Sequence, residues 1–334
     1  MASRLLVTGG AGFIGANFVH FWVKRHPQDR IVVLDALTYA GNLANLDPVK
    51  DHPTFRFVQG NICDDSLVNT LMVEERIDTI VHFAAESHVD RSITGPDAFI
   101  QTNVVGTHVL LKAAKRAWLD NKSWQGNCRF HHVSTDEVYG SLGPDDPPFT
   151  EETPYSPNSP YSASKAASDH LVRAYHHTYG LNTTISNCSN NYGPYQFPEK
   201  LIPLCIVNLL NGKPLPIYGD GKNIRDWLHV EDHCCGIELI IEKGKGGETY
   251  NIGGNSERTN LQVVETLCSI MDELRPGSAP HKKQIQFVKD RPGHDWRYAI
   301  NPAKIKLELG FDTKTDFRQK LGETLEWFLN NDPE

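Results

Sequence analysis

The sequence lacks long apolar runs and clusters of basic residues. Its 334 residues contain no stretch of about 18 consecutive apolar residues, so no membrane-spanning helix is expected. The formal net charge of −8 comes without a Lys/Arg run that could follow a phosphate backbone. This composition argues against nucleic-acid or anionic-membrane binding. Repeats and low-complexity tracts are absent, and the 39% hydrophobic share is ordinary for a globular protein.

The cysteine and histidine patterns exclude two further classes. Seven cysteines, an odd number, include no Cys-x-x-Cys pair, so we expect reduced core residues rather than a disulfide framework. The histidine pairs His131-His132 and His176-His177 have no partners at ligand spacing, and no metal is predicted. No secretory signal pattern precedes the first apolar segment, so the expected location is the cytoplasm.

Strand and helix patterns alternate through about residue 190. Strands are expected at 5–8, 31–35, 55–58, 79–84, 130–134 and 183–187. Such alternation predicts an α/β fold with a Rossmann-type doubly wound parallel sheet. Beyond residue 190, proline-rich and aromatic loops predict a smaller mixed α/β C-terminal lobe. We therefore expect two domains, 1–189 and 190–334.

A glycine-rich turn follows the first expected strand. Gly9 permits the tight turn, Gly12 lets the backbone approach a pyrophosphate, and Gly15 lets a helix over 16–25 pack on the strand. Asp35 ends the second strand 20 residues after Gly15, where it would bind ribose hydroxyls and repel a 2′-phosphate. NAD is therefore expected rather than NADP, and the alternative is a turn that binds no ligand.

Two adjacent carboxylates, Asp136 and Glu137, follow the fifth expected strand. They come at the carboxyl edge of the sheet, where open α/β sheets bind ligands. In one pocket the two groups would not both ionise easily, so one would donate a proton and the other accept one. The alternative is a solvated turn after a strand.

Tyr161 and Lys165 are four residues apart in an expected helix and so lie on one face. An ammonium near the phenol would lower its pKa and let Tyr161 remove a hydroxyl proton as hydride leaves. Alone, this spacing is a weak pattern that is more typical of an ordinary exposed helix surface. Together with the glycine turn and the acid pair, it predicts a dehydration that runs through a ketone.

Several segments carry a resemblance to a known family. The segments Thr8–Gly15, Ser134–Gly140 and Tyr161–Lys165 resemble the extended short-chain dehydrogenase/reductase family. The segments 35–42, 82–91, 187–194, 197–200 and 291–295 are similar to its branch of nucleotide-sugar 4,6-dehydratases that act on dTDP-glucose. The resemblance covers nearly the whole chain.

The resemblance implies an NAD-dependent lyase reaction in three stages. Tyr161, helped by Thr135 and Lys165, removes the C4 hydroxyl proton while hydride passes to NAD. Glu137 as base and Asp136 as acid then eliminate water across C5 and C6. Hydride returns to C6, which gives dTDP-4-keto-6-deoxyglucose. The alternatives are another nucleotide-sugar 4,6-dehydratase, a 4-epimerase that needs no acid–base pair, and a non-catalytic nucleotide-binding module.

The resemblance also implies the binding residues. For NAD these are Gly9, Gly12, Phe13, Ile14, Gly15, Asp35, Leu37, Thr38, Asn61, Ile62, Phe83, Ala84, Ala85, Thr102, Tyr161, Lys165 and Asn191. For the nucleotide sugar they are Ser87, Thr135, Asn190, Glu199, Lys200, Leu201, Pro216, Tyr218, Arg225, Asn260, Arg291, His294 and Tyr298. Without the resemblance, the two arginines would be expected in salt bridges and Tyr218 in the core.

The resemblance further implies organisation and assembly. Domain 1–189 would bind NAD, with part of 224–252 returning to it, and 190–334 would mainly bind substrate. Helices around 104–118 and 161–179 would form a homodimer through a four-helix face, although their apolar residues fit core packing equally. Ala16, Asn61 and Trp296 depart from the family pattern, and none of them belongs to the expected catalytic set.

Overall fold

The computed structural model describes residues 2–121, 126–290, 294–313 and 315–331. Its main element is a seven-stranded sheet in the order β10-β6-β5-β4-β1-β2-β3, in which all neighbours are parallel. The strands are β1 Arg4–Thr8, β2 Arg30–Asp35, β3 Phe55–Gln59, β4 Thr79–His82, β5 Arg129–Thr135, β6 Thr183–Cys188 and β10 Thr249–Ile252. This confirms the predicted fold class.

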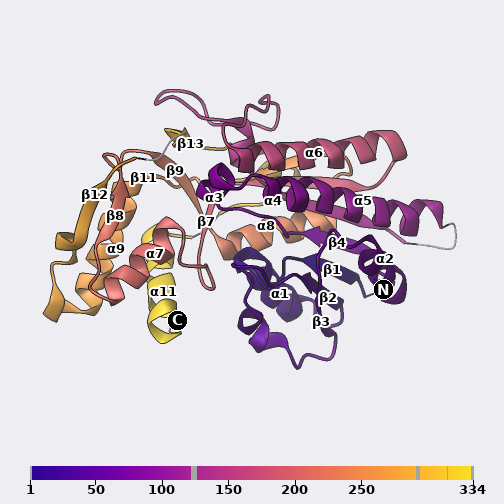
Figure 1. The fold of residues 1–334 in the computed structure, drawn as a ribbon, viewed down its shortest axis with the longest axis horizontal. Helices are drawn as coiled ribbons and strands as arrows, with labels where there is room; N and C mark the ends of the chain where they lie inside the picture. Colours follow the sequence, from indigo (N-terminus) through magenta and orange to yellow (C-terminus); the bar gives the residue numbers. More distant parts are fainter. Residues whose placement is uncertain (1, 122–125, 291–293, 314, 332–334) are drawn as a thin grey trace.

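Helices cover both faces of this sheet, so its strands are buried on both sides; β1 and β2 are largely apolar, whereas β5 and β6 also bury polar side chains. One face packs on α1 (Phe13–Arg25), α8 (Val230–Lys243) and α10 (Ala303–Leu309) through one continuous apolar cluster. The other face packs on α2 (Asp65–Glu74), α5 (Thr107–Lys115) and α6 (Pro160–Tyr179) through a second cluster. Figure 1 shows α5 and α6 running side by side along the sheet.

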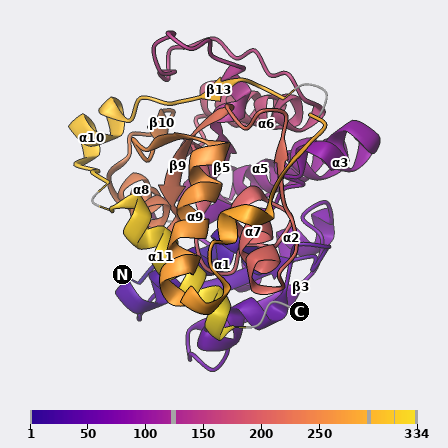
Figure 2. The ribbon, with the colours of Figure 1, turned by 90° about the vertical axis from the view of Figure 1, so that its left-hand side faces the viewer.

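A smaller lobe stands at the carboxyl edge of the sheet. Its helices α7 (Leu201–Leu210), α9 (Asn260–Leu274) and α11 (Phe317–Asn330) share a third apolar cluster and lie together in Figure 2. Its strands are β7 Asn190–Tyr192, β8 Leu215–Tyr218, β9 Ile224–His229, β11 Glu257–Thr259, β12 Ile285–Val288 and β13 Arg297–Tyr298. Strand β9 pairs with β7, β11 and β13, whereas β8 pairs with β12.

The remaining elements are short. Helices α3 (Val89–Thr94) and α4 (Asp97–Phe99) lead into π-helical turns, Ile100–Gly106 and Arg116–Asp120, that extend α5 at both ends. The 3-10 turns are Leu43–Val49, Asp136–Tyr139, Pro276–Ser278 and His281–Gln284. The first helix starts at Phe13, three residues before the predicted position, because extended Gly12 caps it. Strand β4 ends at His82, two residues early, and the chain then turns along the cavity described below.

The cysteines are free in this fold, and only some of them are buried. All seven cysteines are free; Cys188, Cys205, Cys234 and Cys268 are buried, whereas the other three are half-buried, so only part of the set occupies the core. Within the described ranges, no helix combines the length and apolarity needed to cross a lipid bilayer.

Candidate active site

A cavity of about 500 Å³ lies between the carboxyl edge of the large sheet and the smaller lobe. Residues that follow β1, β2, β4, β5 and β6 line one side of it, and residues from β7, β8, β9 and α7 line the other. All five predicted catalytic residues line this cavity: Thr135, Asp136, Glu137, Tyr161 and Lys165. The chain thus brings its acid pair and its Tyr–Lys pair into one space.

The glycine turn leaves room where a dinucleotide phosphate would sit. A Cβ at Gly9, which has φ +69°, would lie 2.6 Å from the Ala84 nitrogen, and one at Gly15 would lie 2.2 Å from the Gly9 oxygen. At Gly12 the nearest atom would be 3.4 Å away, so this glycine borders open space. The Ala16 N–H donates to the Gly12 oxygen. The main-chain N–H groups before it, in the first turn of α1, have no such partner within the helix and can bind an anion.

Asp35 ties the end of β2 to this turn. Its Oδ2 accepts the Ala11 N–H at 2.9 Å, and its Oδ1 accepts the Leu37 N–H at 2.8 Å. The carboxylate still lines the cavity and can accept ribose hydroxyls. Of the seventeen residues expected at the cofactor, sixteen line the cavity. Leu37 lies outside the lining, and its main-chain N–H holds the Asp35 carboxylate.

Strand β5 and the 3-10 turn after it position the acid pair. Asp136 is 2% exposed, and its Oδ2 has no hydrogen-bond partner among the described residues. Burial raises its pKa well above the ordinary carboxyl value, and the nearby charges of Glu137 and Asp226 raise it further. Glu137 is less buried and donates its N–H to Thr135 Oγ1 at 3.3 Å. Asp136 therefore holds its proton more readily than an ordinary carboxyl group, as the acid of an acid–base pair requires.

Helix α6 carries Tyr161 and Lys165 on its cavity face. The Lys165 Nζ donates to the Val133 oxygen at 2.8 Å, and burial lowers the lysine pKa to about 8. Burial raises the pKa of Tyr161 well above its ordinary value, Glu137 adds to this shift, and a hydrogen bond with Thr135 opposes it. The expected lowering of the tyrosine pKa is thus wrong for the protein alone, because desolvation and the nearby Glu137 carboxyl group raise it.

The far end of the cavity holds the residues expected at the nucleotide sugar. Those that line it are Ser87, Thr135, Asn190, Glu199, Lys200, Leu201, Pro216, Tyr218, Arg225, Asn260, His294 and Tyr298. Tyr218 is 43% exposed, which rules out the core alternative. Arg225 is buried, and its guanidinium lies 4.4 Å from the Tyr298 ring centroid and donates to main-chain oxygens of Ile224 and Asp295. Arg291 lies outside the described residues.

Several buried polar groups of the cavity were not predicted from the sequence, among them Gln196 and Cys188. Gln196 lines the site, and its Oε1 has no hydrogen-bond partner within the described part of the chain. The same is true of the Oδ1 of Asn190, which was predicted. Cys188, at the end of β6, also lines the cavity and donates its thiol to the Ser134 oxygen at 3.3 Å. Position at a strand end is the signal that would have found Cys188, whereas Gln196 follows an irregular loop. Partnerless polar oxygens fit a polar ligand.

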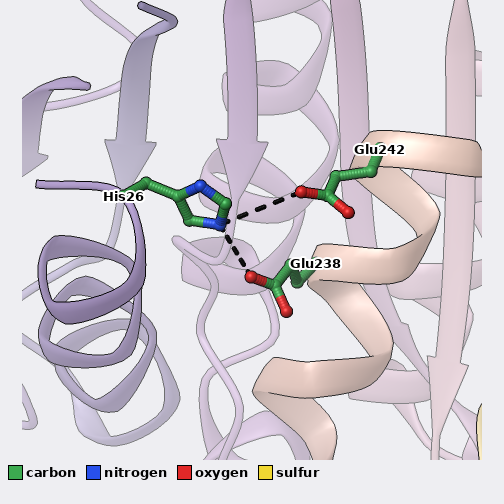
Figure 3. Close-up of side chains that lie close together, drawn as sticks. All are labelled: His26, Glu238 and Glu242. Carbon is green, nitrogen blue, oxygen red and sulfur yellow. Dashed lines mark hydrogen bonds and ion pairs between the residues drawn. The ribbon is translucent and has the colours of Figure 1, made fainter. Parts of the chain in front are cut away.

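The described residues contain one group with metal-ligand geometry, His26, Glu238 and Glu242, shown in Figure 3. His26 Nε2 lies 2.6 Å from Glu238 and 4.0 Å from Glu242, and Arg25 Nε donates to the same Glu238 oxygen at 2.7 Å. All of these residues lie outside the cavity lining. The group joins the end of α1 to α8, and Arg25 already supplies positive charge to its buried carboxylate, so it reads as an interhelical ion pair.

Comparisons with known proteins bear on this site. A family model described as GDP-mannose 4,6 dehydratase matches residues 6–324. A dTDP-glucose 4,6-dehydratase of Xanthomonas campestris pv. campestris (strain B100) is 58% identical over 329 residues, covering 98% of this chain and 93% of that protein. The crystal structure of DesIV, a dTDP-glucose 4,6-dehydratase from Streptomyces venezuelae with NAD bound, has a TM-score of 0.90 and 50% identity, covering 98% of this chain and 97% of that one.

The fold alone does not separate the dehydratase from the epimerase alternative. A UDP-glucose 4-epimerase from Thermotoga maritima also has a TM-score of 0.87, at 27% identity and with coverage of 98% of this chain and 99% of that one. The higher identity to dehydratases over nearly the full length makes the distinction. The chain therefore belongs to the dTDP-glucose 4,6-dehydratase family.

Proposed function

We propose that this chain converts dTDP-glucose to dTDP-4-keto-6-deoxyglucose and water, with NAD as a cofactor that is regenerated in each turnover. The observation that carries the proposal is the acid pair Asp136 and Glu137 in the same cavity as Tyr161. An epimerase needs the tyrosine but has no use for a buried, protonated carboxyl beside a second carboxylate. The raised pKa of Asp136 supports the acid role directly.

The first stage is oxidation at C4. Tyr161 acts as a phenolate and takes the proton of the C4 hydroxyl, Thr135 orients that hydroxyl, and the Lys165 ammonium stabilises the phenolate before the transfer. Bound NAD accepts the C4 hydride and later returns it at C6. Because burial raises the pKa of Tyr161 in the protein alone, the phenol must first release its own proton to solvent, a loss that the surrounding positive charge favours, before it can accept the C4 hydroxyl proton.

The second stage is elimination across C5 and C6. The C4 ketone acidifies the C5 proton, so a carboxylate of ordinary basicity suffices to remove it. Glu137 is assigned this proton because it is the less buried of the two carboxyl groups. Asp136 protonates the departing C6 hydroxyl, and the raised pKa that follows from its burial favours this role. The cavity walls exclude water while the unsaturated intermediate exists.

The binding residues follow the two ends of the cavity. NAD is assigned to the glycine turn, Asp35, Thr38, Asn61 and Phe83, on the side lined by the large sheet. The nucleotide sugar is assigned to the other end, where Arg225 offers a permanently charged fork for a diphosphate and Tyr218 offers an exposed ring face for a base. Asn61 keeps an amide where the family pattern has an acid, and its Oδ1 already accepts the Cys63 N–H at 2.9 Å.

The domain assignment is part of the proposal. Residues 1–189 form the NAD domain and 190–334 mainly the substrate lobe, with part of 224–252 returning to the first domain. Strand β10 supports this return, because residues 249–252 extend the large sheet beside β6. Seven free cysteines support a reducing compartment, and we assign the chain to the cytoplasm.

A homodimer through α5 and α6 completes the proposal. Val105 and Leu119, on the π-helical turns that flank α5, are 36% and 40% exposed, and Tyr179 at the end of α6 is 48% exposed. Apolar side chains on an outer helix face favour a second copy of the same face. Sedimentation at micromolar concentration should give twice the chain mass, and Val105→Glu should give a monomer. A wild-type monomer would refute this interface.

Product mass tests the activity. Purified protein is incubated separately with dTDP-glucose, UDP-glucose and GDP-mannose, without added reductant, and the sugar nucleotides are weighed by mass spectrometry. Loss of one water from dTDP-glucose is the expected result. An isobaric product would favour an epimerase, and the absence of any product would favour a binding module.

A further inference from the structure

A buried charge cluster lies behind the catalytic pair on α6. Asp169 follows Lys165 by four residues, as Lys165 follows Tyr161, so the three side chains share one helix face. Lys165 is 4% exposed and Asp169 is 0% exposed. Lys165 lines the cavity, whereas Asp169 lies outside the lining, one turn farther along the helix.

Neutral hydrogen-bond donors satisfy only one of the two oxygens of the Asp169 carboxyl group. Its Oδ2 accepts the Ser134 hydroxyl at 2.8 Å and the Tyr155 hydroxyl at 2.9 Å. Its Oδ1 lies 3.2 Å from His132 Nε2 but has no hydrogen-bond partner among the described residues. A buried carboxylate is costly unless a positive charge is near. The pKa of Asp169, about 6 because burial outweighs the nearby Lys165, leaves it ionised at neutral pH.

The positive charge in this cluster is Lys165. Its Nζ lies 3.5 Å from His132 Nε2, the same ring nitrogen that lies 3.2 Å from Asp169 Oδ1, so this nitrogen links the ammonium to the carboxylate. Burial lowers the pKa of His132 well below its ordinary value, which keeps its ring neutral. Burial also lowers the pKa of Lys165 to about 8, and Asp169 is the main group that opposes this shift.

The titratable groups that interact electrostatically with Lys165 include His132, His82 and Cys188 as well as Asp169. On β4, His82 has a pKa that burial lowers well below its ordinary value, so it is neutral. On β6, Cys188 has a pKa that burial raises to about 12, so it is a thiol. On α6, Tyr161 is a phenol for the same reason. Asp169 is thus the group among these that carries a negative charge at neutral pH.

We propose that Asp169 is a positioning residue of the reaction: it is the counter-charge that keeps Lys165 protonated, acting through Nε2 of the neutral His132 ring. Lys165 in turn stabilises the developing phenolate of Tyr161. The inference rests on the proposed function for its catalytic consequence, but the protonation of Lys165 itself is independent of any substrate.

Asp169→Asn removes the charge and keeps the size of the side chain and an acceptor for Ser134 and Tyr155. The rate of C4 oxidation falls as pH rises through the pKa of Lys165. In the variant this alkaline limb should move to lower pH by about one to three units, since removal of an opposite charge has an effect of that order. Tyr139→Phe is the matched control, because its hydroxyl is buried beside Tyr155 but donates to Asn251. Its alkaline limb should stay in place.

A second measurement uses the wild-type holoenzyme and needs no substrate. The ε-carbon resonance of Lys165, assigned by its absence in Lys165→Arg, is titrated by NMR. A main step near pH 8 with a smaller step near pH 6, where Asp169 titrates, is expected. A single step in the NMR titration overturns the proposal. So does a pH–rate profile of Asp169→Asn whose alkaline limb stays at the wild-type pH while the rate is uniformly lower. If wild type titrates as expected but forms no dehydrated product, the proposed function fails and the counter-charge stands.

Discussion

Replacing the buried acid with its amide separates oxidation from dehydration. Asp136→Asn preserves the shape of a side chain that is 2% exposed and therefore leaves the cavity walls unchanged. The amide cannot protonate the departing C6 hydroxyl. Loss of one general acid slows a step by about 10²–10⁴-fold, which corresponds to about 3–5 kcal/mol of barrier. Because C4 oxidation depends on Tyr161 instead, it should continue at close to the wild-type rate.

The assay for this variant is a single turnover with dTDP-glucose in excess protein. Absorbance of reduced nicotinamide should rise and persist, while mass spectrometry finds no loss of water within the wild-type time. Glu151→Gln is a matched control, since burial raises the pKa of this carboxyl too but it lies outside the cavity lining. Dehydration by Asp136→Asn at the wild-type rate would refute the acid assignment, and loss of both steps would mean that Asp136 acts in oxidation.

Four further outcomes are expected. Glu137→Gln should also accumulate reduced nicotinamide and, unlike Asp136→Asn, should not exchange the C5 proton with deuterated water; exchange would exclude Glu137 as the base. Purified wild-type protein should release NAD on denaturation, and a cofactor-free preparation that turns over without added NAD would contradict the scheme. Asp35→Ala should weaken NAD binding by about 1.5–3 kcal/mol, as expected for the loss of a hydrogen bond to a charged group. The affinity difference between NAD and NADP should become smaller, and calorimetric titrations measure both affinities. Leu267→Ala, at a fully buried position of α9, should destabilise folding by about 2–5 kcal/mol in denaturant titrations without changing turnover per folded molecule.

Local patterns in the chain account for most of the large sheet. Strand β2 is a short apolar run and β5 is partly β-branched or aromatic, and the predicted limits of both lie within one residue of the observed ones. The resemblance implied only that part of 224–252 returns to the first domain; the pairing of β10 with β6 was not predicted, because partners more than 60 residues apart have no local signal. Pairings within the smaller lobe, such as β12 with β8, likewise depend on packing rather than on period.

The site was predictable in its members but not in its electrostatics. Asp136 and Tyr161 could be placed in one cavity because both follow from motifs at the carboxyl edge of the sheet. The direction of the Tyr161 pKa could not, because it depends on how completely the surrounding elements exclude water. Asp169 is four residues from Lys165 in the sequence. Its role depends on His132, whose Nε2 strand β5 places close to both side chains. Burial and cross-element contacts are the information that a linear pattern lacks.

The most direct test of the reaction is the fate of the C4 hydrogen. dTDP-glucose carrying deuterium at C4 is converted by the wild-type protein, and the product is examined by NMR and mass spectrometry. Transfer of the deuterium to C6 of a product that has lost water is the predicted result, because one bound cofactor takes and returns the same hydride within one cavity. Deuterium retained at C4 of an isobaric product, or lost to solvent, would contradict the account.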